Sequence, residues 1–331
     1  MPRSIRSKEF ARNYGFWSEA EQSALMDARV AIGGAGGGGF QLGLKLARMG
    51  VGAFSIADPE VFEPENVNRV EGARISNMGR NKAEVFREQL LDINPDADVT
   101  VFPEGVSPDT VEDFLRGASL VLDESDSTTP YVGAMIARQA RAQGIPDVLA
   151  MNIGFAAQVT SFPPTGPWTF ERFHGISPTA RLADIVDATM DLTRSLPYIP
   201  RYADLRSLNS IRSGGSDSVA VPLPSLSIGV DALSAIASTQ VFLHLTAKLS
   251  NHRRSPTWAP AVAYIDTYTF QAGILRGGRG SHYRHLIAAA LWQRRNPQAS
   301  YTVEEIGRRL ADAHHPVADV PAPVRGRHRS D

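Results

Sequence analysis

Residues 29–58, RVAIGGAGGGGFQLGLKLARMGVGAFSIAD, decide the fold of this 331-residue chain. The stretch begins with a short apolar strand at 29–33, which a run of glycines follows. Apolar residues then recur with helical spacing as far as Gly50, where the helix is expected to end. A second apolar strand, 53–57, closes at Asp58. Strand, glycine turn, helix and strand form a βαβ unit, whose two strands are predicted to lie side by side through a right-handed crossover.

The alternation of helix and strand continues beyond this unit. Helices are predicted near 79–92, 108–116 and 131–143, and strands near 98–102, 119–122 and 147–151. Upstream, Ser18 and Glu21 have the spacing of a capping box, which predicts a helix over about 18–28. The pattern therefore predicts an α/β fold: a Rossmann-like, doubly wound, mostly parallel sheet with an N-terminal helical arm.

The second half of the chain has a different composition. Residues 162–224 are rich in Pro, Ser, Gly and Arg, with one clear helix near 180–193, so we predict a crossover or insertion loop that can cover a site. Residues 225–249 form a long apolar helix interrupted by polar residues, which indicates a core or dimer element and not a membrane span. Residues 261–270 alternate as in a strand.

Composition excludes several classes of function. The chain has no cysteine, which excludes disulfides, thiolate nucleophiles, cysteine-ligated zinc and iron–sulfur clusters. Its 34 Lys and Arg nearly balance its 35 Asp and Glu, so no protein-wide field attracts nucleic acid or a membrane, and neither partner is expected. No apolar run approaches the length of a membrane span, and the N-terminus lacks the apolar core of a signal peptide, so we predict a cytoplasmic protein.

The glycine run predicts a nucleotide site. Gly34, Gly36 and Gly39 form GxGxxG between a strand and a helix, where missing side chains let backbone N–H groups approach phosphates. Asp58, at the end of the second strand, is placed to accept the ribose hydroxyls. These features alone do not separate NAD from ATP.

Three polar side chains after Asp58 favour a triphosphate. Asn66, Arg69 and Lys82 follow in the next stretch, and Lys82 stands at the start of a predicted helix. A dinucleotide site has no use for this Arg and Lys, whereas a triphosphate needs cations that neutralise its oxygens before a nucleophile can attack phosphorus.

Together with Asp126, these residues resemble the ubiquitin-activating-enzyme-like superfamily of ThiF, MoeB and HesA adenylyltransferases. The glycine run, Asp58 and the DESDS segment that begins at Asp123 carry the resemblance, which covers about 9–160. By that resemblance, Asp58 would hold the ribose of ATP and Asp126 would hold Mg²⁺, with Asp123 just behind the metal.

The resemblance also implies phosphate contacts and an assembly. The residues implied to hold phosphate are Gly34, Gly36, Gly37, Gly39, Asn66, Arg69 and Lys82. Arg12, in the N-terminal arm, matches an arginine that reaches across a homodimer toward the ATP of the neighbouring subunit. From its pattern and composition, the chain is divided into an arm and helix (1–28), an ATP-binding core (29–161), a crossover loop with a long helix and C-terminal strands (162–275), and a basic tail (276–331), helical and then disordered.

The differences from that family limit the reactions that the chain is expected to catalyse. Without cysteine the chain has neither the thioester nucleophile nor the CxxC zinc site of many members, and Val70 stands where Gln is common. We predict ATP- and Mg²⁺-dependent adenylation of a carboxylate, on a peptide or protein C-terminus or on a small acid, without a cysteine thioester step. An NAD(H)-dependent oxidoreductase and a non-catalytic nucleotide-binding partner subunit remain alternatives. The basic tail is read as a solvated terminus, with a contact to an acidic partner or RNA as the other interpretation.

Overall fold

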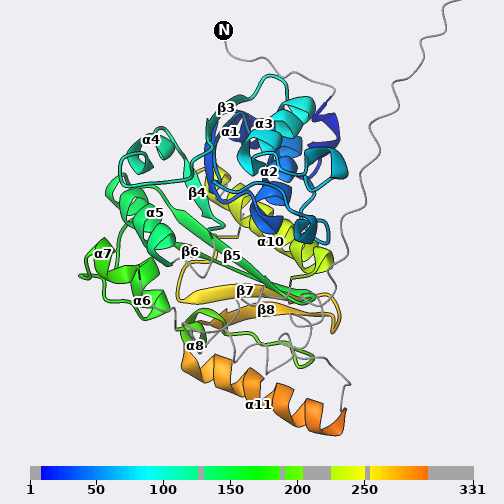
Figure 1. Ribbon diagram of the computed structural model, residues 1–331, viewed down its shortest axis with the longest axis vertical. Coiled ribbons are helices and arrows are strands. Elements are labelled where there is room, and N and C mark those ends of the chain that lie inside the picture. The colour runs from blue at the N-terminus through cyan, green and yellow to red at the C-terminus, as the bar shows by residue number, and fades with distance from the viewer. Residues whose placement is uncertain (1–8, 126–129, 187–190, 204–224, 250–253, 297–331) are drawn as a thin grey trace, which may run out of the picture.

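The computed structural model describes residues 9–125, 130–186, 191–203, 225–249 and 254–296. Within them, one sheet has the strand order β3-β2-β1-β4-β5-β6-β7-β8 (Figure 1). The strands are β1 (Arg29–Gly33), β2 (Ala53–Ala57), β3 (Asp98–Phe102), β4 (Leu120–Asp123), β5 (Asp147–Ile153), β6 (Ala156–Phe162), β7 (Ala261–Asp266) and β8 (Gln271–Arg276). The first five are parallel, and β6 to β8 extend the sheet antiparallel. The predicted α/β fold with a mostly parallel sheet is confirmed.

Helices cover both faces of this sheet. They are α1 (Glu19–Asp27), α2 (Gly37–Met49), α3 (Lys82–Ile93), α4 (Val111–Phe114), α5 (Pro130–Ala142), α6 (Phe170–His174), α7 (Leu182–Ile185), α8 (Leu192–Ser195), α10 (Ser227–Thr246) and α11 (Arg279–Arg295), with 3-10 helices η1 (Ala11–Asn13), η2 (Pro64–Asn66) and η3 (Ile75–Asn77). Ser18 caps α1 as predicted, since the N–H of Glu21 donates to its hydroxyl (3.3 Å).

The parallel strands are buried on both sides. Val30 and Ile32 of β1 pack in the core that includes α2, α3 and α10, whereas Ala31 packs with α4 and α5. Figure 1 shows these two sets of helices on opposite sides of the sheet. Such double coverage is what makes the strands of a parallel sheet continuous apolar runs instead of alternating ones.

The antiparallel part of the sheet departs from the sequence prediction. β5 turns at Gly154 and returns as β6, a strand that the sequence analysis did not predict. The predicted strand 261–270 is wrong at its end, because β7 stops at Asp266. The Oδ1 atom of Asp266 accepts hydrogen bonds from the N–H groups of Tyr268 (3.0 Å) and Thr269 (3.1 Å). This turn sends the chain back as β8.

The helix predicted near 180–193 is also wrong as a single element. α7 and α8 are two short helices on either side of 187–190, residues that lie outside the described part of the chain. α8 has a start of its own, because Asp191 accepts a hydrogen bond from the N–H of Thr193 (3.1 Å). The last third of the predicted crossover loop (204–224) and the end of the tail (297–331) likewise fall outside the described residues.

The long apolar helix predicted at 225–249 is α10. Among the described residues it is the one helix long and apolar enough to cross a membrane, yet 61% of its apolar window is buried inside the protein. It packs against α2, β5 and β6. The structure therefore uses α10 as a core helix.

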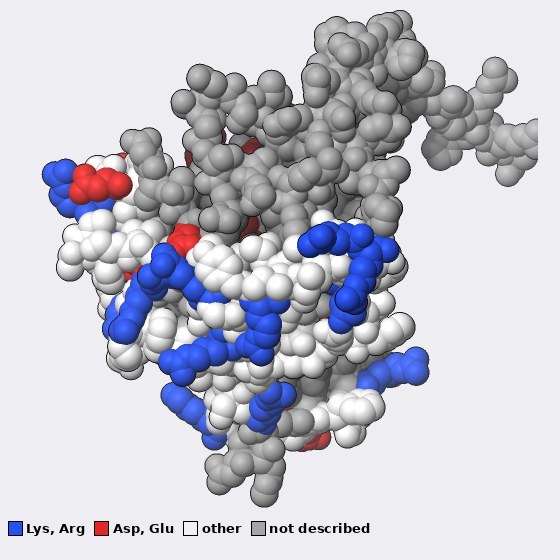
Figure 2. Space-filling view, turned by 90° about the horizontal axis from the view of Figure 1, so that it is seen from below, with Lys and Arg blue, Asp and Glu red and all other residues white. Residues whose placement is uncertain are grey.

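The C-terminal helix α11 carries the described part of the basic tail. Arg279, Arg284, Arg294 and Arg295 belong to it. Figure 2, which looks at this end of the molecule, shows many Lys and Arg side chains and few acidic ones between them. The division of the chain into four segments stays a prediction.

Candidate active site

The carboxyl ends of β1, β2 and β4 meet at one edge of the sheet. Gly33, the last residue of β1, pairs with Ala57 of β2 on one side and with Asp123 of β4 on the other. The strand order reverses here, because β2 and β3 lie on one side of β1 and β4 lies on the other. Ligands of open α/β sheets bind at such a reversal, outside the carboxyl ends of the strands.

The turn between β1 and α2 requires glycine at two places. Gly34 has φ +111°, and a Cβ there would overlap the carbonyl oxygen of Glu124. A Cβ on Gly39 would overlap the carbonyl oxygen of Gly34, whereas one on Gly36 would meet nothing within 4 Å. The turn therefore brings the predicted glycines together and leaves open space in front of Gly36.

α2 presents the start of a helix to this space. Its N-cap, Gly36, has no side chain to accept hydrogen bonds from the first turn. The first N–H groups of a helix carry partial positive charge and bind anions such as phosphate. A Cβ on Gly37 would lie 3.5 Å from Cγ of Arg69, so an arginine side chain runs beside the helix start.

Asp58 ties the end of β2 to the glycine turn. Its Oδ2 accepts a hydrogen bond from the N–H of Ala35 (2.6 Å), and its Oδ1 accepts one from Glu60 (2.8 Å). Burial raises the pKa of Asp58, and these two hydrogen bonds and the charge of Lys82 act against that rise. A carboxylate thus stands against the glycine turn, and its contact with ribose stays a prediction.

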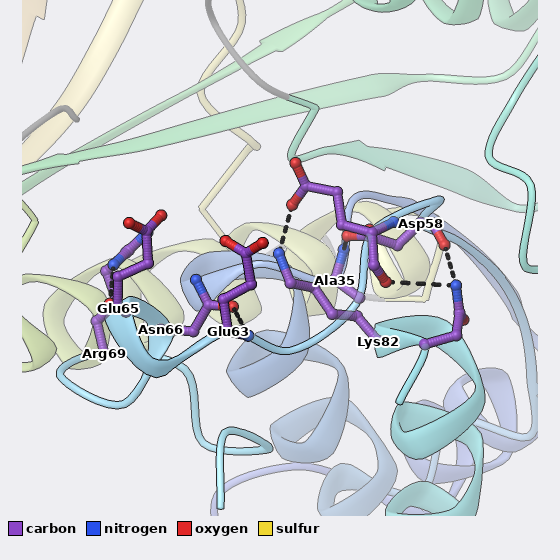
Figure 3. A network of polar contacts seen from close by, with 9 residues as sticks. Ala35, Asp58, Glu63, Glu65, Asn66, Arg69 and Lys82 are labelled. Atoms are coloured by element: carbon purple, nitrogen blue, oxygen red, sulfur yellow. Dashed lines mark hydrogen bonds and ion pairs between the residues drawn. The ribbon is translucent and has the colours of Figure 1, made fainter. Parts of the chain in front are cut away.

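Lys82 is the first residue of α3. The helix is capped by Asn81, whose side chain accepts a hydrogen bond from the N–H of Glu84 (3.1 Å). The Lys82 side chain is 6% exposed, and its Nζ forms an ion pair with Glu60, whose side chain is 67% exposed. Figure 3 shows Lys82 beside Asp58. The predicted phosphate cation is therefore next to the glycine turn, but in this state a carboxylate holds it.

Asn66 and Arg69 lie on the turn that follows β2 (Figure 3). Asn66 is buried, and its Oδ1 accepts a hydrogen bond from the N–H of Glu63 (3.0 Å). Nη1 of Arg69 donates to the carbonyl of Glu65 (3.0 Å) and to Oδ1 of Asn68 (2.9 Å). Local hydrogen bonds thus fix both side chains on the loop that faces α2.

Asp123 lies at the end of β4, at the edge of the site. Oδ1 of Asp123 accepts hydrogen bonds from the N–H (3.1 Å) and hydroxyl (2.5 Å) of Ser125, while its buried Oδ2 has no partner in the described structure. Burial raises the pKa of Asp123. Asp126, the predicted metal ligand, lies outside the described residues.

Glu124 is a residue of the site that the sequence analysis did not single out. A Cβ on Gly38 would overlap its carboxyl group, so this side chain lies directly under the first turn of α2. Burial, and then the charge of Asp123, raise the pKa of Glu124 well above its usual range. The only sequence signal for Glu124 is its position next to Asp123. Its contact with the glycine turn could not be predicted from the sequence.

Arg12 and the end of the predicted crossover region stand in different relations to the site. Arg12 lies exposed on η1, and in the described part of the chain no contact joins it to the glycine turn or to Lys82. After the crossover region the chain returns at Ser225, whose carbonyl accepts a hydrogen bond from Asn68 (2.9 Å) and whose hydroxyl accepts one from Asn152 (2.9 Å). The returning chain therefore joins the loop that carries Arg69 to the end of β5.

A model of the ThiF family matches residues 10–281. The chain belongs to the ThiF family. This ThiF family member is 37% identical over 145 residues to the tRNA threonylcarbamoyladenosine dehydratase of Escherichia coli (strain K12), a match that covers 44% of this chain and 52% of that protein. It is 30% identical over 149 residues to the sulfur carrier protein ThiS adenylyltransferase of the same strain, with coverage of 44% and 57%. The chain therefore matches about half the length of these relatives.

Solved structures share the fold of this ThiF family member. The E. coli MccB structure with ATP has a TM-score of 0.58 at 16% identity and covers 84% of this chain and 73% of that one. The E. coli tRNA N6-threonylcarbamoyladenosine dehydratase, TcdA, has a TM-score of 0.51 at 23% identity and covers 72% and 95%. At these identities the likeness concerns the fold.

Proposed function

We propose that this ThiF family member uses ATP to adenylate a carboxylate. The observation that carries the proposal is the uncapped start of α2 at the strand-order reversal, with Arg69 on the loop beside it and Lys82 at the start of α3. The family supports the same activity, since one similar protein is a ThiS adenylyltransferase and one structural neighbour was solved with ATP. An oxidoreductase site would leave Lys82 and Arg69 unexplained.

The reaction needs no side-chain nucleophile. An oxygen of the substrate carboxylate attacks the α-phosphorus of ATP, the bond from that phosphorus to the bridging oxygen breaks, and pyrophosphate leaves with the electron pair. The N–H groups of the glycine turn bind phosphate oxygens, and Lys82, Arg69 and Asn66 bind the departing group and stabilise its growing charge. Asp58 holds the ribose hydroxyls.

Mg²⁺ completes this proposal. Asp126 would hold the ion, and Asp123, whose buried Oδ2 has no partner in the described structure, would stand behind it. When bound, the ion neutralises charge on the phosphates. Glu124 adds no further ligand here, because its carboxyl group lies behind the glycine turn.

The substrate is a peptide or protein C-terminus, or a small acid. Since the chain has no cysteine, the acyl-adenylate cannot pass to a thiol of the enzyme. Its acceptor is an amine, water or a nucleophile within the substrate. One similar protein is named a sulfur carrier protein ThiS adenylyltransferase, and the structural neighbour MccB was solved in complex with N-formylated MccA.

The active form is proposed to be a cytoplasmic homodimer. In it, Arg12 of one subunit would reach the phosphates bound by the other, which suits an exposed residue with no contact to its own glycine turn. An Arg12→Ala chain mixed with a Lys82→Ala chain would then regain one working site per hybrid dimer, and no regain after verified subunit exchange would remove this role.

Two measurements test the activity. ATP with Mg²⁺ should raise the unfolding free energy by roughly 2.7 kcal/mol at about 100 times its dissociation constant, whereas NADH should not. Exchange of labelled pyrophosphate into ATP should then appear with peptides that end in a free carboxylate and be absent with the same peptides amidated. Stabilisation by NADH alone would favour the oxidoreductase, and ATP binding without exchange on any substrate would favour the non-catalytic partner.

A further inference from the structure

A cavity lined by arginines lies between α6, α8 and the start of α11. Its volume is about 290 Å³, and its walls carry Arg172, Arg194 and Arg279, while none of the described residues that line it is acidic. Figure 1 shows α8 next to α6 and to the start of α11, at the end of the molecule away from α2. The face of the protein around α11 is rich in Lys and Arg (Figure 2). The charge of the lining therefore favours an anion.

Asp191 lies beside the cavity and holds two of these arginines in place. Its Oδ2 pairs with Nη2 of Arg279 (3.0 Å) and with Nε of Arg194 (3.2 Å), and its Oδ1 accepts a hydrogen bond from the N–H of Thr193 (3.1 Å). Burial acts to raise the pKa of Asp191, but hydrogen bonds from Thr193 and Arg279 outweigh it and lower that pKa below its usual value. Three guanidinium groups and one carboxylate together carry a net charge of +2.

Arg172 is oriented by the ring of Trp168, which also lines the cavity. The guanidinium carbon of Arg172 lies 4.7 Å from the centroid of this ring, and its Nη1 donates to the carbonyl of Pro167 (3.2 Å). A guanidinium group that stacks on a ring keeps N–H groups along its edge, where they can donate to an anion. The side chains of Arg194 and Arg279 are 42% and 62% exposed, so a ligand from solvent can reach them.

The start of α11 adds positive charge to that of the arginines. Gly278, its N-cap, has φ +130° and no side chain that could accept hydrogen bonds from the first turn. A Cβ on Gly277 would lie 2.6 Å from the ring of Phe173, so a larger residue would push against this wall of the cavity. α11 has 17 residues, and the first N–H groups of such a helix carry partial positive charge. The helix start thus reinforces a site whose main charges are the three guanidinium groups.

We propose that this cavity binds a phosphate group, which accepts hydrogen bonds from Arg172, Arg194 and Arg279 and lies against the start of α11. A dianionic phosphate matches the net charge of +2, whereas a carboxylate would neutralise only half of it. Two sources can supply this group, free phosphate and a phosphate ester. The nucleotide residues follow the carboxyl ends of β1, β2 and β4, so this site is separate from the proposed adenylation and does not depend on it.

The test uses a reporter in the cavity, because phosphate can also bind at the glycine turn. Protein labelled with fluorotryptophan carries four labelled indoles, and Trp168→Phe identifies the resonance of Trp168. The full-length protein is titrated without nucleotide, with inorganic phosphate and with Nα-acetyl-O-phosphoserine amide, which represents an ester. At least one of them should shift the Trp168 resonance saturably, with a dissociation constant of about 1 mM. Trp17, which stacks on Phe242 elsewhere, should not follow this curve.

Two variants and a matched control show which charges bind the probe. Arg194→Gln and Arg279→Gln should each weaken binding about fivefold, because each removes one exposed guanidinium group. Arg284→Gln changes the net charge equally on the same helix, but Arg284 is exposed outside the lining, so binding should stay within about twofold of wild type. Acetate at the same ionic strength should bind at least about tenfold more weakly than the phosphate probe.

The two phosphate probes identify the source of the group. Tighter binding of phosphoserine amide would identify an ester, and tighter binding of inorganic phosphate would identify the free ion. The proposal would be overturned by the absence of a Trp168 shift with either probe up to roughly 50 mM, by acetate that binds as tightly as phosphate, or by unchanged binding in both arginine variants. An equal loss in Arg284→Gln would also overturn it, since binding would then reflect the general charge of this face.

Discussion

Replacing Glu60 with Gln should make ATP bind more tightly while making the free protein less stable. Glu60 holds the Nζ of Lys82 in an ion pair, and Lys82 is the cation proposed to meet the phosphates. ATP must therefore displace Glu60 before Lys82 can bind it. Glu60→Gln removes the competing charge and shortens no side chain.

The exposure of the Glu60 side chain sets the size of the expected effect on ATP affinity and on stability. Glu60 is 67% exposed, so its pair with Lys82 is screened by water and is worth about 1 kcal/mol, not the several expected of a dry pair. Losing a competitor of that strength should tighten ATP binding about fivefold. The same loss leaves the nearly buried Lys82 without its partner in the free protein, so the unfolding free energy should fall by about 1 kcal/mol.

Calorimetric titration with ATP and thermal unfolding without it measure the two effects. Glu84→Gln is the matched control, because Glu84 is an exposed acid two residues from Lys82 and changes the net charge equally. In a Lys82→Met background, Glu60→Gln should alter ATP affinity by less than about twofold. A Glu60→Gln protein that binds ATP no better than wild type, or an effect that persists without Lys82, would refute the competition.

Three further substitutions test other parts of the structure. Gly34→Ala should lower the unfolding free energy by about 1–3 kcal/mol and weaken ATP binding, since its Cβ overlaps a backbone carbonyl at positive φ; wild-type unfolding and binding would contradict the turn geometry. Ser18→Ala should cost about 1 kcal/mol in denaturant unfolding through loss of the α1 cap, and no change would show that the cap is redundant. Burial lowers the pKa of His174 to about 4, so the unfolded chain takes up a proton first and stability falls as pH drops from about 6.5 toward 4. Between pH 7 and 5 wild type should therefore lose about 2 kcal/mol more than His174→Gln, and parallel curves would contradict a buried neutral histidine.

The parallel half of the fold could be predicted because its signals are local. β1 and β2 are short apolar runs that end at a glycine turn and at an acid, and such runs need no knowledge of distant contacts. The sequence analysis missed β6 for two reasons. All its residues are buried, so apolar and polar residues do not alternate along it, and the turn from β5 has no tight-turn signal other than Gly154. The end of β7 was missed for a similar reason: side-chain hydrogen bonds of Asp266 stop the strand while the alternating pattern runs on.

In the candidate site too, the sequence predicted local features and missed the contacts between distant residues. The motif predicted where Asp58 and Lys82 would lie, because Asp58 ends the βαβ unit and Lys82 follows it by a short stretch. The motif could not predict the contacts of these two residues. Lys82 forms an ion pair with Glu60, and the carboxylate of Asp58 accepts hydrogen bonds from the N–H groups of Ala35 and Glu60. These contacts change the functional interpretation. Glu60 is tied to both residues, through its backbone to Asp58 and through its side chain to Lys82, so a nucleotide that draws Lys82 away also releases the Glu60 side chain from the loop that Asp58 anchors. A site described by its motif alone has a free cation at Lys82, whereas in this structure Lys82 is already paired with Glu60, and the proposed phosphate contact requires it to change partners.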